Sequence, residues 1–127
     1  MNNFLELINV RKSFTMEKKI NVLRGLSRKF RLGKTYAIMG PSGSGKSTLL
    51  NLISLIDKPT SGTIKLDNHE INFNQNEKND LIRAKKLGIV YQENNLLADF
   101  TALENVYFAS LSPVSYTHLT LPTTLTV

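Results

Sequence analysis

One segment constrains the fold of this chain more than any other. Residues 40–48 read Gly-Pro-Ser-Gly-Ser-Gly-Lys-Ser-Thr, which fits the pattern G-x-x-x-x-G-K-[ST] of a phosphate-binding loop. The apolar residues 36–39 before it predict a buried strand, and residues 47–56 after it predict a helix. Strand, glycine-rich loop and helix in this order are the setting that the motif needs, and a simple Gly- and Ser-rich turn would not explain it. We therefore predict an α/β fold built around a phosphate-binding loop.

The chemistry of anion binding explains the residue types in this segment. Glycines allow successive backbone N–H groups to point inward at an anion, and the start of a helix favours negative charge. Lys46 is expected to reach the β- and γ-phosphates of a nucleotide, and the Ser47 hydroxyl is expected to ligate Mg²⁺. The candidate nucleotide-binding residues of the loop are Gly40, Pro41, Ser42, Gly43, Ser44, Gly45, Lys46, Ser47 and Thr48.

Composition limits the remaining possibilities. The 127 residues suit one domain, and 41% hydrophobic with 20% charged residues is typical of a globular protein. No apolar run approaches the roughly 20 residues of a membrane helix, and the N-terminus does not resemble a signal peptide, so we expect a cytoplasmic chain. The net charge of +6 is spread along the sequence without a basic run. A solvated basic surface explains this charge better than a nucleic-acid partner, and we expect none.

Periodicity predicts the other elements. Alternation of apolar and polar residues predicts a strand at residues 4–14, turn residues separate it from further extended segments, and a Thr-x-x-Glu pattern predicts the start of a helix. Gly88 is expected to cap a helix C-terminus. The predicted strands are residues 4–14, 20–32, 63–66 and 87–91, and the predicted helices are residues 80–86 and one that opens at Thr101. We expect the helix at residues 47–56 to be buried on most sides, because apolar residues recur around it.

The last part of the chain differs from the rest. Residues 112–127 contain no Asp, Glu, Lys or Arg and are rich in Thr. Residues 114–124 resemble the translation of a sequencing adapter. We therefore expect two parts, a partial domain at residues 1–111 and a tail at residues 112–127 that is not native.

Together these motifs resemble the ATP-binding subunit of an ABC transporter, of the lipoprotein-releasing or macrolide-export type. The resemblance covers residues 3–111, where residues 40–48 look like the Walker A loop and residues 89–92 like the Q-loop. It implies the N-terminal part of an ABC-type P-loop NTPase, with an antiparallel β-subdomain and the start of a parallel-sheet core. Phe14 stands where the family has an aromatic residue that stacks on adenine, although a core position at the end of a strand is the alternative. Gln92 corresponds to a residue that ligates Mg²⁺ or orients the attacking water.

The resemblance also implies partners and a location. It predicts Mg²⁺ and ATP as ligands, a homodimer of ATP-binding subunits, and a permease in the membrane on whose inner face the subunit lies. Lys46 and Gln92 would act in catalysis, and ATP hydrolysis would drive export or lipoprotein release. The LSGGQ signature, the Walker B strand and the switch His of the family do not occur in this sequence. We therefore expect the chain as written to be truncated before these motifs, poorly soluble and without ATPase activity.

Two other functions stay open at this point. One is a short module that binds ATP without hydrolysing it. The other, less favoured, is a DNA-associated ABC-type ATPase, for which the basic composition would be suitable.

Overall fold

The computed structural model describes residues 3–93 and 95–111. The tail expected at residues 112–127 lies outside the described residues. The chain divides into two compact units, Met1–Asn79 and Asp80–Val127, and each is described by itself.

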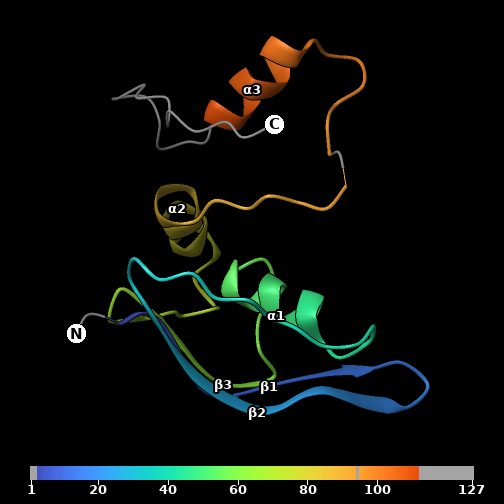
Figure 1. Ribbon diagram of the computed structural model, residues 1–127, viewed down its shortest axis with the longest axis vertical. Coiled ribbons are helices and arrows are strands. Elements are labelled where there is room, and N and C mark those ends of the chain that lie inside the picture. Colours follow the sequence, from blue (N-terminus) through green and yellow to red (C-terminus); the bar gives the residue numbers. More distant parts are fainter. Residues whose placement is uncertain (1–2, 94, 112–127) are drawn as a thin grey trace. The chain divides into compact units, whose positions relative to one another are not determined.

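The first unit is built on an antiparallel sheet with the strand order β2-β1-β3-β4 (Figure 1). The predicted strands at residues 4–14, 20–32 and 63–66 are confirmed to within two residues at each end. The strands are β1 (Asn3–Thr15), β2 (Lys19–Arg31), β3 (Ser61–Leu66) and β4 (His69–Glu70).

A β-bulge divides β1 into two halves. The register of β1 shifts between Leu7 and Val10 against β2, and Asn9 has a positive φ of 48°. Its backbone N–H donates to the Ser27 hydroxyl at 2.8 Å. The extra residue changes which side chains face the core, since neighbours in a strand alternate between faces. Leu5 and Leu7 are buried before the bulge, whereas Val10 and Lys12 are buried after it.

Helix α1 (Lys46–Ile53) covers one face of this sheet (Figure 1). It ends three residues before the predicted residue 56, and Leu55 turns the chain with a φ of 58°. The expectation that this helix is buried on most sides is wrong, because Leu50 and Ile56 are about half exposed. The buried apolar core consists of Leu5, Leu7, Val10, Leu49, Leu52, Leu55, Ile64, Leu66 and Ile71.

The strand predicted at residues 36–39 is not formed. Tyr36 is fixed instead by its side chain, whose hydroxyl accepts from the Arg31 N–H at 3.0 Å and whose ring meets Phe30 edge to face at 5.0 Å. Met39 is 89% exposed. A strand needs a neighbour for its backbone N–H and C=O groups, and no described strand pairs with this segment.

Two further predictions after residue 79 are wrong. Residues 87–91 do not form a strand, and Val90 is 99% exposed. The same lack of a paired neighbour among the described strands accounts for this. Gly88 does not take a left-handed conformation, because α2 (Asn76–Lys86) has already ended, with the Leu87 N–H bonded to the Arg83 carbonyl at 3.0 Å. Helix α2 also begins four residues earlier than predicted.

The capping box of α3 (Ala102–Ser110) is confirmed. The Thr101 hydroxyl accepts from the Glu104 N–H at 3.2 Å, and the Glu104 carboxylate accepts from the Thr101 N–H at 2.8 Å. The bond from the Thr101 N–H, together with a second bond that the Thr101 hydroxyl donates to the same carboxylate at 2.8 Å, holds the pKa of Glu104 below its usual value, because both stabilise the ionised form. No helix within the described ranges has the length and apolar character required to cross a bilayer.

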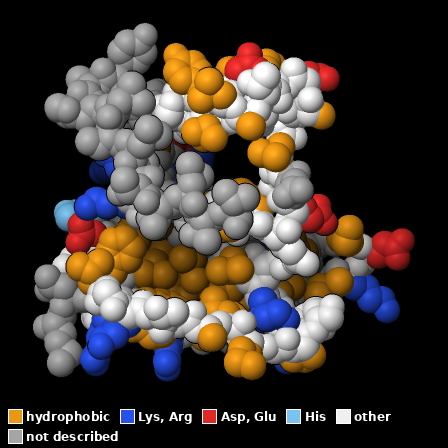
Figure 2. Space-filling view, turned by 45° about the horizontal axis from the view of Figure 1, so that its top comes forward, with side chains coloured by type: hydrophobic (Ala, Val, Ile, Leu, Met, Phe, Trp, Pro, Cys, Tyr) orange, Lys and Arg blue, Asp and Glu red, His pale blue; other side chains and the backbone are white. Residues whose placement is uncertain are grey.

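Large apolar side chains remain exposed in both units. Met16, Met39, Val90 and Leu103 are each more than three-quarters exposed. Figure 2 shows apolar side chains gathered on the face that it draws, with Lys and Arg side chains along the margin. This exposure agrees in direction with the expected poor solubility, which itself stays a prediction.

Candidate functional site

The glycine-rich loop runs directly into α1. Gly43 and Gly45 have positive φ angles of 79° and 93°, which other residues rarely adopt. Gly45 is the N-cap of α1, and its carbonyl accepts from the Leu49 N–H at 2.9 Å. Within the loop, the Ser44 N–H donates to the Pro41 carbonyl at 3.2 Å. The backbone therefore takes the turned path that the motif predicts.

The loop also lies tightly against the sheet. A Cβ atom on Gly45 would lie 2.9 Å from Val22 and 3.3 Å from Leu23, both side chains of β2. A Cβ atom on Gly40 would lie 2.6 Å from the Ser44 hydroxyl. Close approach to β2 and its positive φ therefore favour glycine at Gly45, whereas the contact at Gly40 lies within the loop and involves a side chain that can rotate.

Lys46 folds back over the loop that precedes it. Its ammonium donates to the Gly40 carbonyl at 2.6 Å, to the Pro41 carbonyl at 2.8 Å and to the Ser44 hydroxyl at 3.4 Å. The first turn of α1, all of it described, carries no acidic side chain. The loop therefore combines three features in one place: a positive charge, the unpaired N–H groups of a helix start, and a turned backbone. This combination suits a phosphate group.

Ser47 and Thr48 follow in the first turn of α1, where Ser47 is exposed and Thr48 is half-buried. Ser47 offers one hydroxyl oxygen, a suitable ligand type for Mg²⁺. Across residues 3–93 and 95–111, no group of three or more His, Cys, Asp or Glu side chains could hold a metal ion. Ser47 therefore suits Mg²⁺ as one ligand beside nucleotide phosphates.

Phe14 lies near the end of β1 and is 41% exposed, which does not agree with the alternative of a core position. The ammonium of Lys12 lies 5.0 Å from the centre of its ring. Gln92 is exposed and belongs to the second unit, whereas the loop and Phe14 belong to the first. Its part in the site stays a prediction from the resemblance.

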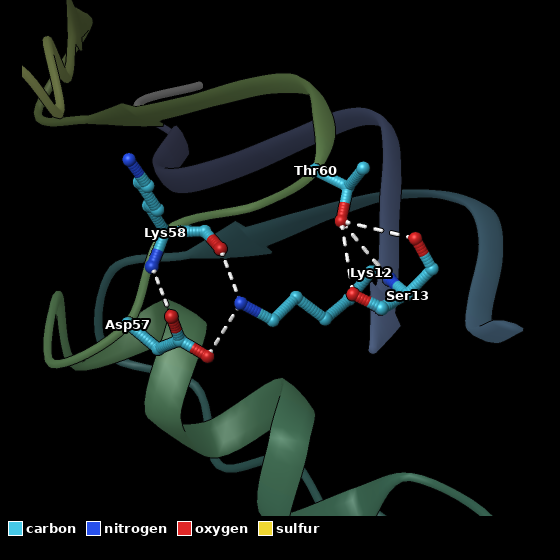
Figure 3. Close-up of polar contacts among 5 residues, drawn as sticks. All are labelled: Lys12, Ser13, Asp57, Lys58 and Thr60. Carbon is cyan, nitrogen blue, oxygen red and sulfur yellow. Dashed lines mark hydrogen bonds and ion pairs between the residues drawn. The ribbon is translucent and has the colours of Figure 1, made fainter. Parts of the chain in front are cut away.

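The sequence analysis missed the ion pair between Lys12 and Asp57, whose Nζ and Oδ2 atoms are 2.7 Å apart (Figure 3). Burial raises the pKa of Asp57, but the hydrogen bonds from Lys12 and the Lys58 N–H, with the charges of both lysines, outweigh it and lower the pKa. The only signal in the sequence was a lysine within a predicted strand, and alternation alone does not show which face of the strand this lysine occupies.

Comparison with known proteins identifies the class. A family model described as ABC transporter matches residues 23–124, which is more than half of the chain. The chain belongs to this family, among its ATP-binding subunits, and its fold is that of the N-terminal part of an ABC-type P-loop NTPase.

Individual relatives come from several organisms. The chain is 44% identical over 103 residues to the uncharacterized ABC transporter ATP-binding protein MJ0796 of Methanocaldococcus jannaschii, covering 80% of this chain and 44% of that protein. It is also 44% identical over 111 residues to the lipoprotein-releasing system ATP-binding protein LolD of Rickettsia bellii, covering 87% of this chain and 48% of that protein. The chain thus spans about half the length of the curated relatives it matches.

Solved structures show the same relationship. The dimeric post-hydrolysis state of the ATP-binding cassette MJ0796, bound to ADP and Pi, matches with a TM-score of 0.82 at 39% identity over 93% of this chain and 50% of that one. The structure of cbiO1 from Clostridium perfringens, part of the ABC transporter complex cbiONQ, matches with a TM-score of 0.70 at 27% identity. That match covers 96% of this chain and 45% of the other.

Proposed function

We propose that this chain binds Mg-ATP through residues 40–48. The observation that carries the proposal is the position of the Lys46 ammonium, which lies over the turned loop at the start of α1. In this position the side chain would donate to phosphate oxygens as a point charge, while the N–H groups of the loop and of the first helical turn bond the remaining oxygens. Ser47 would hold Mg²⁺ together with the phosphates.

The base of the nucleotide would stack on Phe14. The exposed part of this ring offers an apolar surface of the kind on which bases stack. The ring and the loop belong to the same unit, so the sheet fixes both.

For the whole subunit we propose the activity of a transporter ATPase. Two copies would form a homodimer that binds ATP, and hydrolysis would drive export or lipoprotein release through a membrane permease, from the inner face of the membrane. The relative LolD is named for lipoprotein release, MJ0796 is described as a dimer, and cbiO1 as part of a transporter complex. In the hydrolysis step, Lys46 would stabilise the charge that develops on the phosphates, and Gln92 would hold Mg²⁺ or orient water.

The loop is tested by titrating the chain with ATP in the presence of Mg²⁺ by isothermal calorimetry. Lys46→Ala removes charge-assisted hydrogen bonds worth about 1.5–3 kcal/mol, so the affinity for ATP should fall roughly tenfold to a hundredfold. Lys34→Ala is the matched control, because it removes the same charge from an exposed position outside the motif. If both variants bind ATP as the unchanged chain does, the loop is not the binding site.

A further inference from the structure

A buried lysine lies beside the ring proposed to receive the base. Lys12 is only 9% exposed, and its ammonium contacts Asp57 Oδ2 at 2.7 Å and donates to the Lys58 carbonyl at 2.8 Å (Figure 3). A buried ammonium needs such partners, because transfer out of water disfavours its charge. The Phe14 ring centre lies 5.0 Å from the same nitrogen, within the range of a cation–π interaction.

The partners of Lys12 are themselves fixed. Asp57 Oδ1 accepts from the Lys58 N–H at 2.7 Å, which orients the carboxylate. Thr60 connects the same turn to β1 on both sides of Lys12: its N–H donates to the Arg11 carbonyl at 2.8 Å, and its hydroxyl accepts from the Ser13 N–H at 3.0 Å. Figure 3 shows Lys12 extending from β1 between Thr60 and Asp57. The ammonium is therefore held at a fixed point relative to the strand.

The sheet connects this point to the glycine-rich loop. Lys12 pairs with Leu23 of β2, and Leu23 is one of the two side chains against which Gly45 lies. Phe14 lies two residues further along β1, a distance of about 7 Å along a strand. The two residues share a face of β1, as alternation requires.

We propose that Lys12 is a positioning residue for Phe14. Its anchored ammonium attracts one face of the ring and fixes the orientation of the side chain, so that the exposed remainder of the ring is ready for a nucleobase. Without the cation, a ring that is 41% exposed would sample several rotamers, and base binding would have to order it. This inference rests on the proposed ATP binding and adds a residue that touches neither phosphate nor base.

A comparison of ATP with inorganic tripolyphosphate tests the role. Both carry the phosphates that the loop would bind, but only ATP carries a base, so the ratio of the two affinities measures recognition of the nucleoside. Phe14→Leu should lower this ratio about fivefold or more, because it removes a stacking surface. Lys12→Met should lower the ratio to a similar extent and leave the tripolyphosphate affinity unchanged. Lys12→Arg keeps the cation and should recover most of the ratio, while Lys12→Met with Phe14→Leu should fall no further than Phe14→Leu alone.

A second variant guards against loss of folding. Lys12→Met leaves the Asp57 carboxylate without its partner, whereas Lys12→Met with Asp57→Asn removes both charges; it should fold and still show the lowered ratio. Proton NMR adds a direct readout, since the Lys12 ε-methylene signals should lie upfield beside the ring and lose this shift in Phe14→Leu. The positioning role alone would be overturned if the ratio of ATP to tripolyphosphate affinity is unchanged in both Lys12→Met variants, while Lys46→Ala binds neither ATP nor tripolyphosphate. If Lys46→Ala loses neither ligand, ATP binding at the loop and the positioning role are both wrong.

Discussion

Replacement of Gly62 by alanine should lower the unfolding free energy of the first unit by more than the intrinsic preferences of glycine and alanine predict. A Cβ atom at this position would lie 2.4 Å from the Asn9 carbonyl oxygen and 2.7 Å from Val10 Cα. All the nearest atoms are backbone atoms of the bulge, so no side-chain rotation can relieve the contact. The backbone would have to retreat by about 1 Å to reach ordinary van der Waals separation.

The expected magnitude has two parts. Gly62 has a φ of +91°, and an L-residue in such a conformation costs about 1–2 kcal/mol. Overpacking against the bulge adds about 1–3 kcal/mol. The sum, about 2–5 kcal/mol, is a large fraction of the 5–15 kcal/mol by which folded domains are stable.

Gly33→Ala is the matched control for this prediction. Gly33 also has a positive φ, of +73°, but nothing lies within 4 Å of the added Cβ. It should therefore show only the conformational cost, partly offset because alanine restricts the unfolded chain. Urea unfolding of both variants, followed by far-UV circular dichroism, measures the difference. Equal losses of unfolding free energy would refute the argument that β3 requires glycine because it passes close to the bulge.

Three further outcomes can be measured on the same chain. Leu52→Ala should lower the unfolding free energy by about 2–5 kcal/mol, because Leu52 is fully buried, and half-exposed Leu50 in the same helix should lose clearly less as alanine. The pKa of Asp57 is depressed in the folded state, so the stability that its ion pair contributes is present above the unfolded pKa of about 3.9 and lost as pH falls through the folded pKa. Acid titration of the unfolding midpoint should show this loss, and the same loss in Asp57→Asn would contradict it. Thr101→Ala should speed amide exchange in α3, because a lost N-cap costs about 1 kcal/mol, whereas Thr101→Ser should not.

Local patterns predicted the parts of the fold that local interactions determine. Alternation located β1, the turns around them located β2 and β3, and a four-residue pattern located the start of α3, because strand faces, turns and helix caps depend on near neighbours. The strands expected at residues 36–39 and 87–91 failed for the complementary reason. A run of apolar residues allows a strand, but pairing with another strand forms it, and the described sheet offers these segments none.

The candidate site shows the same division. The geometry of Gly43, Gly45 and Lys46 follows from a contiguous motif, and the structure adds only the acceptors of the ammonium. Lys12 and Asp57 are 45 positions apart in the sequence. Their ion pair depends on the bulge that lies between the start of β1 and Lys12. No periodicity in the sequence contains that information.

Residues on the same face of a regular strand are separated by an even number of positions. Because of the bulge at Asn9, the buried residues before and after it are separated by an odd number. Leu7 and Lys12 are five positions apart, yet both are buried, because one residue between them is not counted in the alternation. If that residue took its place in the alternation, the leucines would stay inside and the second half of the strand would exchange its two faces. Ser13 would turn inward, and Lys12 and Phe14 would turn to the opposite side of the sheet. The presence of the cation and the ring beside the loop therefore depends on this bulge. A related chain that keeps five positions between the two buried side chains should keep the bulge, and one with four positions should form a regular strand.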